Sequence, residues 1–92
     1  NGGHRHIAVA SKLKAEGVKA GIPDLFLPVP RGELHGLYIE MKAQGGKVSP
    51  AQKAMMKALK GQGYGCIVAY TWNQAFETIK EYLSEEVIAS YT

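Results

Sequence analysis

The feature that most constrains the fold is a helix start at Ser49-Pro50-Ala51-Gln52, between two apolar runs. Serine is a favoured N-cap, proline suits the first helical position, and a glutamine three residues after the cap forms a capping box. The helix is predicted to run to about Gln62 and to stop at Gly63. The flanking runs, 37–43 and 64–70, are predicted strands. A strand–helix–strand crossover pairs its two strands in parallel.

The remaining elements complete a small α/β sheet. A strand over about 24–29 and the loop 31–36 predict an antiparallel hairpin with the strand 37–43. The apolar run 64–70 is predicted to be the central strand of the sheet. We therefore expect a mixed β-sheet flanked by helices, in one domain that comprises residues 1–92.

Two further helices are predicted at the ends of the chain. The first covers about His4 to Glu16, where apolar residues recur at helical spacing and Gly17 is a natural stop. The last is expected to be capped by Asn73 and to extend as far as Val87 and Ile88. Its predicted apolar face comprises Phe76, Ile79, Tyr82 and Leu83.

Composition excludes several classes of protein. No apolar run approaches the roughly 20 residues of a membrane span, and no signal peptide opens the chain. The one cysteine, Cys66, excludes an internal disulfide, and the scattered histidines offer no zinc-ligand spacing. We expect an intracellular, cytoplasmic protein without a small-molecule cofactor and without a membrane partner.

Charge is distributed unevenly along the chain. Residues 1–60 carry ten Lys/Arg against four Asp/Glu, a balance of +6, whereas residues 61–92 carry one lysine against four glutamates, a balance of −3. On the helix 50–62, Lys53, Lys57 and Lys60 form a basic stripe at i, i+4 and i+7. This pattern fits a polyanionic partner such as nucleic acid. An ordinary solvated surface would also explain it.

Two acids and a lysine mark the candidate site. Asp24 follows a proline at the start of the first predicted strand, and Glu40 and Lys42 lie two residues apart in the second. Side chains alternate in a strand, so Glu40 and Lys42 share a face, and hairpin pairing would bring Asp24 close to Glu40. Such a patch is costly unless a cation occupies it. Taken singly, Pro-Asp suits a turn, and Glu-x-Lys suits a surface ion pair.

Gln52 supports two interpretations. It can serve only as the capping-box residue of its helix. On a helical wheel, however, it falls within the apolar stripe of Met55, Met56 and Leu59, and so it faces the sheet. A polar group there needs a partner, and the carboxylate patch is within reach.

Together, Gly21-Ile22-Pro23-Asp24, Glu40-Met41-Lys42 and Gln52 resemble the virus-type replication-repair nuclease (VRR-NUC) domain, a branch of the PD-(D/E)xK nucleases. The resemblance covers Gly3 to about Leu83 and implies a restriction-endonuclease-like core. Compact phage-encoded members look like dimeric Holliday-junction resolvases, which implies a homodimer acting on branched DNA. Relatives usually carry an acid on a helix before the first motif strand, and the upstream acid here is Glu16.

The resemblance assigns roles to residues. It implies that Asp24, Glu40 and the Met41 backbone carbonyl bind Mg²⁺ or Mn²⁺. It also implies that Lys42 orients the attacking water or stabilises charge on the phosphate, and that Gln52 positions Lys42 or the water. Phosphate contacts are expected from six basic residues: His4, Arg5, His6, Lys47, Lys53 and Lys57. Two alternatives remain: a non-catalytic nucleic-acid-binding α/β domain, and a structural or partner-binding domain with Glu40–Lys42 as a surface ion pair.

Overall fold

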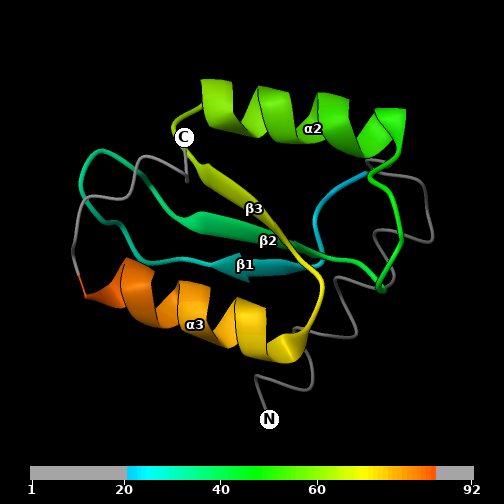
Figure 1. Ribbon diagram of the computed structural model, residues 1–92. Coiled ribbons are helices and arrows are strands. Elements are labelled where there is room, and N and C mark those ends of the chain that lie inside the picture. Colours follow the sequence, from blue (N-terminus) through cyan, green and yellow to red (C-terminus); the bar gives the residue numbers. More distant parts are fainter. Residues whose placement is uncertain (1–20, 85–92) are drawn as a thin grey trace, which may run out of the picture.

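A three-stranded sheet carries the fold (Figure 1). In this computed structural model, which describes residues 21–84, the strands are β1 (Leu25–Leu27), β2 (Leu37–Met41) and β3 (Gly65–Ala69), in the order β1-β2-β3. β1 pairs with β2 antiparallel, and β2 pairs with β3 in parallel. The predicted mixed sheet, hairpin and crossover are therefore confirmed.

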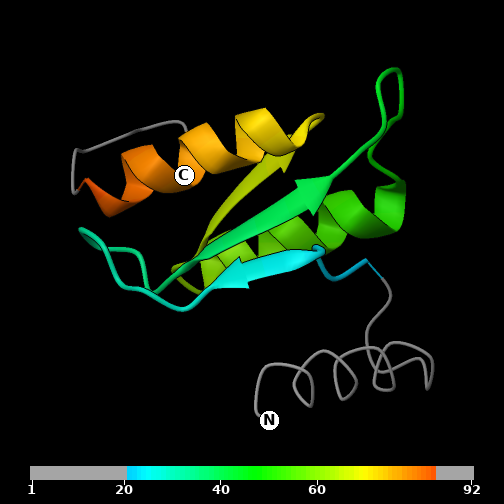
Figure 2. The same ribbon diagram turned by 90° about the horizontal axis from the view of Figure 1, so that it is seen from below.

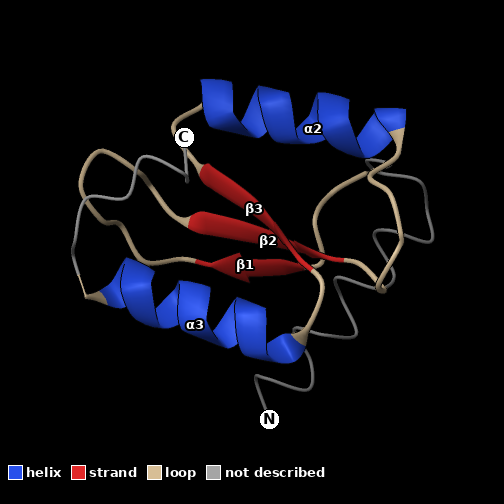
Figure 3. Cartoon of the chain, viewed as in Figure 1, coloured by secondary structure: helices blue, strands red, loops and turns tan. Residues whose placement is uncertain are grey.

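Two helices cover opposite faces of the sheet and give three layers (Figures 1 and 3). Helix α2 (Pro50–Gly61) lies on one face and helix α3 (Trp72–Leu83) on the other. Viewed from below, α3 lies along the sheet on the side away from α2 (Figure 2). Across residues 21–84, neither helix has the length and apolar character that a bilayer span requires.

The main core lies between the sheet and α3. Its buried members are Leu37, Ile39, Ala69, Ala75 and Tyr82. Tyr82 is 1% exposed, and its hydroxyl donates a 2.6 Å hydrogen bond to the Val29 carbonyl, which ties the end of α3 to the segment after β1. Burial raises the pKa of this phenol, and the nearby Arg31 opposes that rise.

Three expectations about the elements were wrong. The run 64–70 is not central: within residues 21–84, β3 lies at one side of the sheet and β2 lies in the middle. β3 is nevertheless apolar because α2 packs on one of its faces and α3 on the other. The N-cap of α3 is Thr71 rather than Asn73, since the Thr71 hydroxyl accepts from the Gln74 N–H at 3.0 Å.

The third correction concerns the apolar face of α3. Tyr82 is buried and Ile79 is half-buried, but Phe76 is 57% exposed and Leu83 is 39% exposed. The small Ala75 is buried instead and belongs to the core between the sheet and α3. The helix expected over His4–Glu16 and the extension through Val87 and Ile88 lie outside the described residues.

Candidate active site

The two predicted carboxylates lie at the same end of neighbouring strands. The β1–β2 register pairs Leu25 with Ile39. Asp24 directly precedes Leu25, so it lies beside the Glu40–Met41 end of β2, and Glu40 faces α2, where Gln52 contacts it. Asp24 is exposed, and its Oδ2 accepts a 3.0 Å hydrogen bond from the Met41 N–H. Glu40 is only 3% exposed, so one carboxylate lies at the rim of the site and the other beneath it.

The backbone of Met41 is directed toward the same patch. The next residue, Lys42, donates its N–H to Ala69 on β3 at 2.9 Å, so the Met41 N–H points the other way, toward Asp24. Residues of a hydrogen-bonded antiparallel pair exchange both bonds, so the N–H and C=O of a residue leave an extended strand on the same side. The Met41 carbonyl oxygen therefore faces the Asp24 side of β2.

Lys42 completes the polar face of β2. Its Nζ lies 3.6 Å from Glu40 Oε2, and the two side chains are 18% and 4% exposed. This ion pair is more enclosed than a surface pair, and a buried charge without its partner is strongly destabilising. The structure thus makes the expected Glu40–Lys42 pair but places it beneath helix α2 rather than on a solvated face.

Gln52 satisfies both of its predicted interpretations at once. Its Oε1 accepts from the Ser49 N–H at 2.8 Å, and its N–H donates to Ser49 Oγ at 3.1 Å, which forms the capping box. Its Nε2 donates a 2.9 Å hydrogen bond to Glu40 Oε2. One amide therefore fixes the first turn of α2 and holds the carboxylate that also faces Lys42.

Gly21 is a positioning residue that the sequence analysis included in the family motif without assigning it a role. Its φ is +87°, and a Cβ built on it would lie 2.7 Å from the Ala51 carbonyl oxygen. Cβ atoms essentially never approach a backbone atom that closely. The segment that delivers Asp24 therefore contacts the first turn of α2, beside Gln52. The available signal was the glycine three residues before Asp24.

An aromatic cluster continues the same face of the sheet away from the carboxylates. Phe26 stacks on Tyr38 with 4.4 Å between ring centroids, and Tyr64 meets both rings edge to face at 5.9 Å and 5.5 Å. Burial and the neighbouring Tyr64 and Cys66 raise the pKa of Tyr38. The cluster packs Phe26 of β1 against Tyr38 of β2, its partner in the register, and so stabilises the pairing that brings Asp24 to the end of β2.

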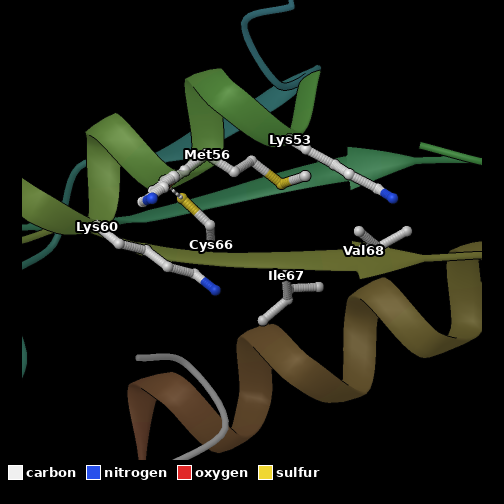
Figure 4. Close-up of a pocket in the computed structure, with 7 residues that line it drawn as sticks. Lys53, Met56, Lys60, Cys66, Ile67 and Val68 are labelled. Atoms are coloured by element: carbon white, nitrogen blue, oxygen red, sulfur yellow. Dashed lines mark hydrogen bonds between the residues drawn. The ribbon is translucent and has the colours of Figure 1, made fainter. Parts of the chain in front are cut away.

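A basic groove runs along α2 on the β3 side (Figure 4). It has a volume of about 330 Å³ and is lined by Lys53, Met56, Lys57, Lys60, Cys66, Ile67 and Val68. Cys66 is buried, and its thiol lies 3.7 Å from the Met56 carbonyl. Burial raises the pKa of this thiol despite the nearby Lys60. The predicted Lys53 and Lys57 are brought together here, and Lys60, left out of the predicted DNA contacts, joins them.

Comparison with known proteins gives the family. The VRR-NUC domain family matches residues 3–72, most of the chain. The chain belongs to the VRR-NUC family. A solved structure described as a VRR_NUC domain protein is 36% identical and superimposes with a TM-score of 0.71, over 88% of this chain and 68% of that one. No curated protein matches. VRR-NUC domains are nucleases, so nucleic acid is a partner of this chain.

Among the remaining predicted site residues of this VRR-NUC domain, Lys47 lies in the described part of the chain. Lys47 is exposed in the loop between β2 and α2. His4, Arg5, His6 and Glu16 lie outside the described residues. Within residues 21–84, no three His, Cys, Asp or Glu side chains gather as a metal-ligand group. A cation here would be held by two carboxylates and backbone oxygen, a donor set typical of Mg²⁺ and unlike that of zinc.

Proposed function

We propose that this VRR-NUC domain is a Mg²⁺- or Mn²⁺-dependent endodeoxyribonuclease that cuts branched DNA, with the four-way Holliday junction as its substrate. The observation that carries the proposal is the geometry of one patch. Asp24 directly precedes β1 and contacts the Met41 N–H of β2, Lys42 lies 3.6 Å from Glu40, and Gln52 donates to the same carboxylate. Asp24 at the rim leaves this patch open on one side.

The residues present fit a hard divalent cation. Asp24 and Glu40 would hold it with the Met41 carbonyl, and the Met41 N–H fixes the Asp24 carboxylate on the same side of β2. When bound, such an ion neutralises charge on the phosphate and lowers the pKa of a bound water. Gln52 and Lys42 would keep Glu40 in one orientation, and such outer contacts are what orient carboxylate ligands.

Lys42 is suited to act on the transition state. Its ammonium lies on the carboxylate face, is partly exposed, and is held by Glu40. A fixed cation next to the phosphate stabilises the negative charge that develops on the phosphate oxygens during attack by water. The same ammonium can donate a hydrogen bond that orients the attacking water. Its contribution should therefore be to the rate of cleavage more than to affinity.

The basic groove would carry the DNA backbone away from the site. Lys53 follows Gln52 directly, and the lysines continue along α2 to Lys60, a rise of about 10 Å at 1.5 Å per residue. That length is enough to contact two successive phosphates of one strand. Contacts of this kind position DNA and carry no sequence information. Together with Lys47, they suit an enzyme that recognises DNA shape.

A homodimer would account for paired cuts. The buried core of residues 21–84 is small, and pairing with a second copy would add buried apolar surface. A two-fold dimer presents two equivalent sites. A four-way junction has the same symmetry, so two symmetrically placed nicks follow without base readout. Light scattering during gel filtration should give twice the chain mass.

Metal binding and cleavage test the catalytic proposal directly. Calorimetric titration with Mn²⁺ should show binding that Asp24→Asn and Glu40→Gln each abolish, while Glu33→Gln, an exposed acid in the β1–β2 loop, leaves it intact. Labelled four-way junction, flap, duplex and single-stranded DNA should be incubated with and without Mg²⁺. Unchanged Mn²⁺ binding in both site variants would refute the metal site. DNA binding without cleavage in either metal would instead support the non-catalytic nucleic-acid-binding domain, which the basic groove alone also explains.

Lys42→Ala separates catalysis from binding. Because Lys42 is assigned to the transition state, the variant should bind junction DNA within about threefold of wild type and lose cleavage by at least 10²-fold, the usual loss for one such group. Lys80→Ala, which removes an exposed lysine on α3, is the matched control and should cleave normally. Wild-type cleavage by Lys42→Ala would mean that the lysine serves only the ion pair with Glu40.

A further inference from the structure

The segment that follows β3 lies beside the catalytic lysine. The parallel register pairs Met41 with Ala69, and the ladder continues because the Lys42 N–H donates to the Ala69 carbonyl at 2.9 Å. Tyr70 follows that carbonyl directly and begins the bend that leads from β3 to α3, so its backbone lies beside that of Lys42. The proposed nuclease function gives Tyr70 no role.

Two aromatic side chains on this segment are exposed at the site's end of the sheet. Tyr70 is 37% exposed and Trp72, the first residue of α3, is 69% exposed, the highest value among the exposed large apolar residues of the described chain. The sheet and the helices place the β2 end, the β3 end and the α3 start at one edge of the molecule (Figure 1). Tyr70 and Trp72 connect the end of β3 to the start of α3, so their backbone lies at the edge where β2 ends before Lys42.

The backbone beneath these rings is held firmly. The Tyr70 N–H donates to Gln74 Oε1 at 2.8 Å, and the Thr71 hydroxyl accepts from the Gln74 N–H at 3.0 Å. Gln74 thus fixes the turn from both sides. An exposed ring on a fixed backbone loses little freedom when a flat ligand stacks on it. The backbone that carries the two rings is therefore preorganised for stacking.

We propose that Tyr70 and Trp72 form an aromatic platform on which an unstacked base of the DNA strand packs, next to the phosphate that is cut. This inference rests on the proposed nuclease function and adds a binding subsite to it. Every base has a flat π-face, so such stacking is tolerant of sequence. Intact duplex hides those faces, whereas a branch point or a single strand exposes them. The platform would therefore favour branched or single-stranded DNA where the lysine groove alone would not.

The chain carries its own reporter, because Trp72 is its one tryptophan. We would titrate metal-free protein in EDTA with a labelled four-way junction, a single-stranded oligonucleotide and an intact duplex, and follow binding by anisotropy of the label. Trp72 fluorescence should be strongly quenched at saturation by the junction and the single strand, and clearly less by the duplex. Because EDTA prevents cleavage, this measurement does not depend on catalysis.

Substitutions test the stacking itself. Trp72→Leu should weaken binding of the single strand by about 5- to 100-fold, the range for loss of one base stack. The slope of log affinity against log salt should stay unchanged, since stacking releases no counterion. Tyr70→Leu should weaken binding in the same direction while keeping the Trp72 reporter. Phe76→Leu, an exposed aromatic one turn along α3, is the matched control and should bind as wild type.

An abasic site provides the sharper control. If a base stacks on Trp72, wild-type protein should bind a strand with the abasic site near the cut as weakly as Trp72→Leu binds the intact strand. The two effects together should not add.

Full saturation without quenching, or unchanged affinity of both variants, would overturn the platform even if junctions are cleaved. A Trp72 spectrum that shifts with protein concentration in the absence of DNA would also overturn it and assign the ring to an interface between copies. Quenching without cleavage in Mg²⁺ would keep the platform and reject the nuclease.

Discussion

Replacing Gln52 with glutamate isolates the hydrogen bond that joins helix α2 to the site. A glutamate three residues after the N-cap still completes a capping box, so the Ser49 N–H keeps its acceptor. The variant lacks only the Nε2 donor that bonds Glu40 at 2.9 Å. A hydrogen bond to a charged group contributes about 1.5–3 kcal/mol, and a second carboxylate against the buried Glu40 adds repulsion. The unfolding free energy should therefore fall by at least about 1.5–3 kcal/mol.

Urea denaturation of metal-free protein at neutral pH measures this decrease. With an m-value of about 1–2 kcal/mol per molar, the midpoint should fall by roughly 1–2 M. Gln44→Glu changes the net charge equally in an exposed loop, and its stability should stay within about 0.5 kcal/mol of wild type. If Gln52→Glu is as stable as Gln44→Glu, the Gln52–Glu40 bond contributes nothing, and the argument that α2 holds the carboxylate is refuted.

Three other features of the molecule can be tested by substitution. Gly21→Ala should lower the unfolding free energy by about 2–5 kcal/mol, because a left-handed φ and a clash with the Ala51 carbonyl both oppose it; thermal melting that matches wild type would contradict the geometry. Because the pKa of Tyr82 is raised in the folded protein, the stabilisation that its protonated phenol provides is complete below its ordinary pKa near 10 and is lost as pH rises through the folded-state pKa. Chemical denaturation from pH 9 to 11 should therefore show that the unfolding free energy falls less steeply with pH in Tyr82→Phe than in wild type. Replacing both Lys53 and Lys57 with glutamine should reduce the salt slope of DNA binding by about two, one for each phosphate that these lysines would neutralise, and an unchanged slope would remove the groove from the DNA path.

The topology could be predicted because several local signals agreed. The capping box, the proline at the first helical position and the apolar runs on either side required a parallel crossover, and the structure contains it. The wheel position of Gln52 correctly pointed its amide at the sheet. These predictions were correct because each signal concerns residues close in sequence, where backbone geometry allows few conformations.

Prediction was wrong where the choice depended on tertiary packing. An apolar run indicates that both faces of a strand are buried, and the two helices bury both faces of β3. Within residues 21–84, β3 nevertheless pairs with β2 alone, so its composition could not reveal its place in the sheet. Thr71 and Asn73 are both good N-caps, and the structure selects Thr71 through Gln74, whose side chain also holds Tyr70. Phe76 fits the helical stripe, yet the residues of α3 that pack on the core are Ala75, Ile79 and Tyr82, and Phe76 is exposed beside them.

The site shows why residue spacing alone could not predict every residue that shapes it. Glu40 and Lys42 are set by alternation along one strand, and Asp24 by hairpin register, so the sequence suffices for them. Gly21 depends on how closely the segment before β1 passes the first turn of α2, an approach between segments some 30 residues apart that no local pattern encodes. Tyr70 depends on the β2–β3 register, which follows only once the crossover has closed. Gly21 and Tyr70 therefore share one property: each is placed by long-range packing beside a segment that carries site residues, Gly21 beside the first turn of α2 and Tyr70 beside Lys42.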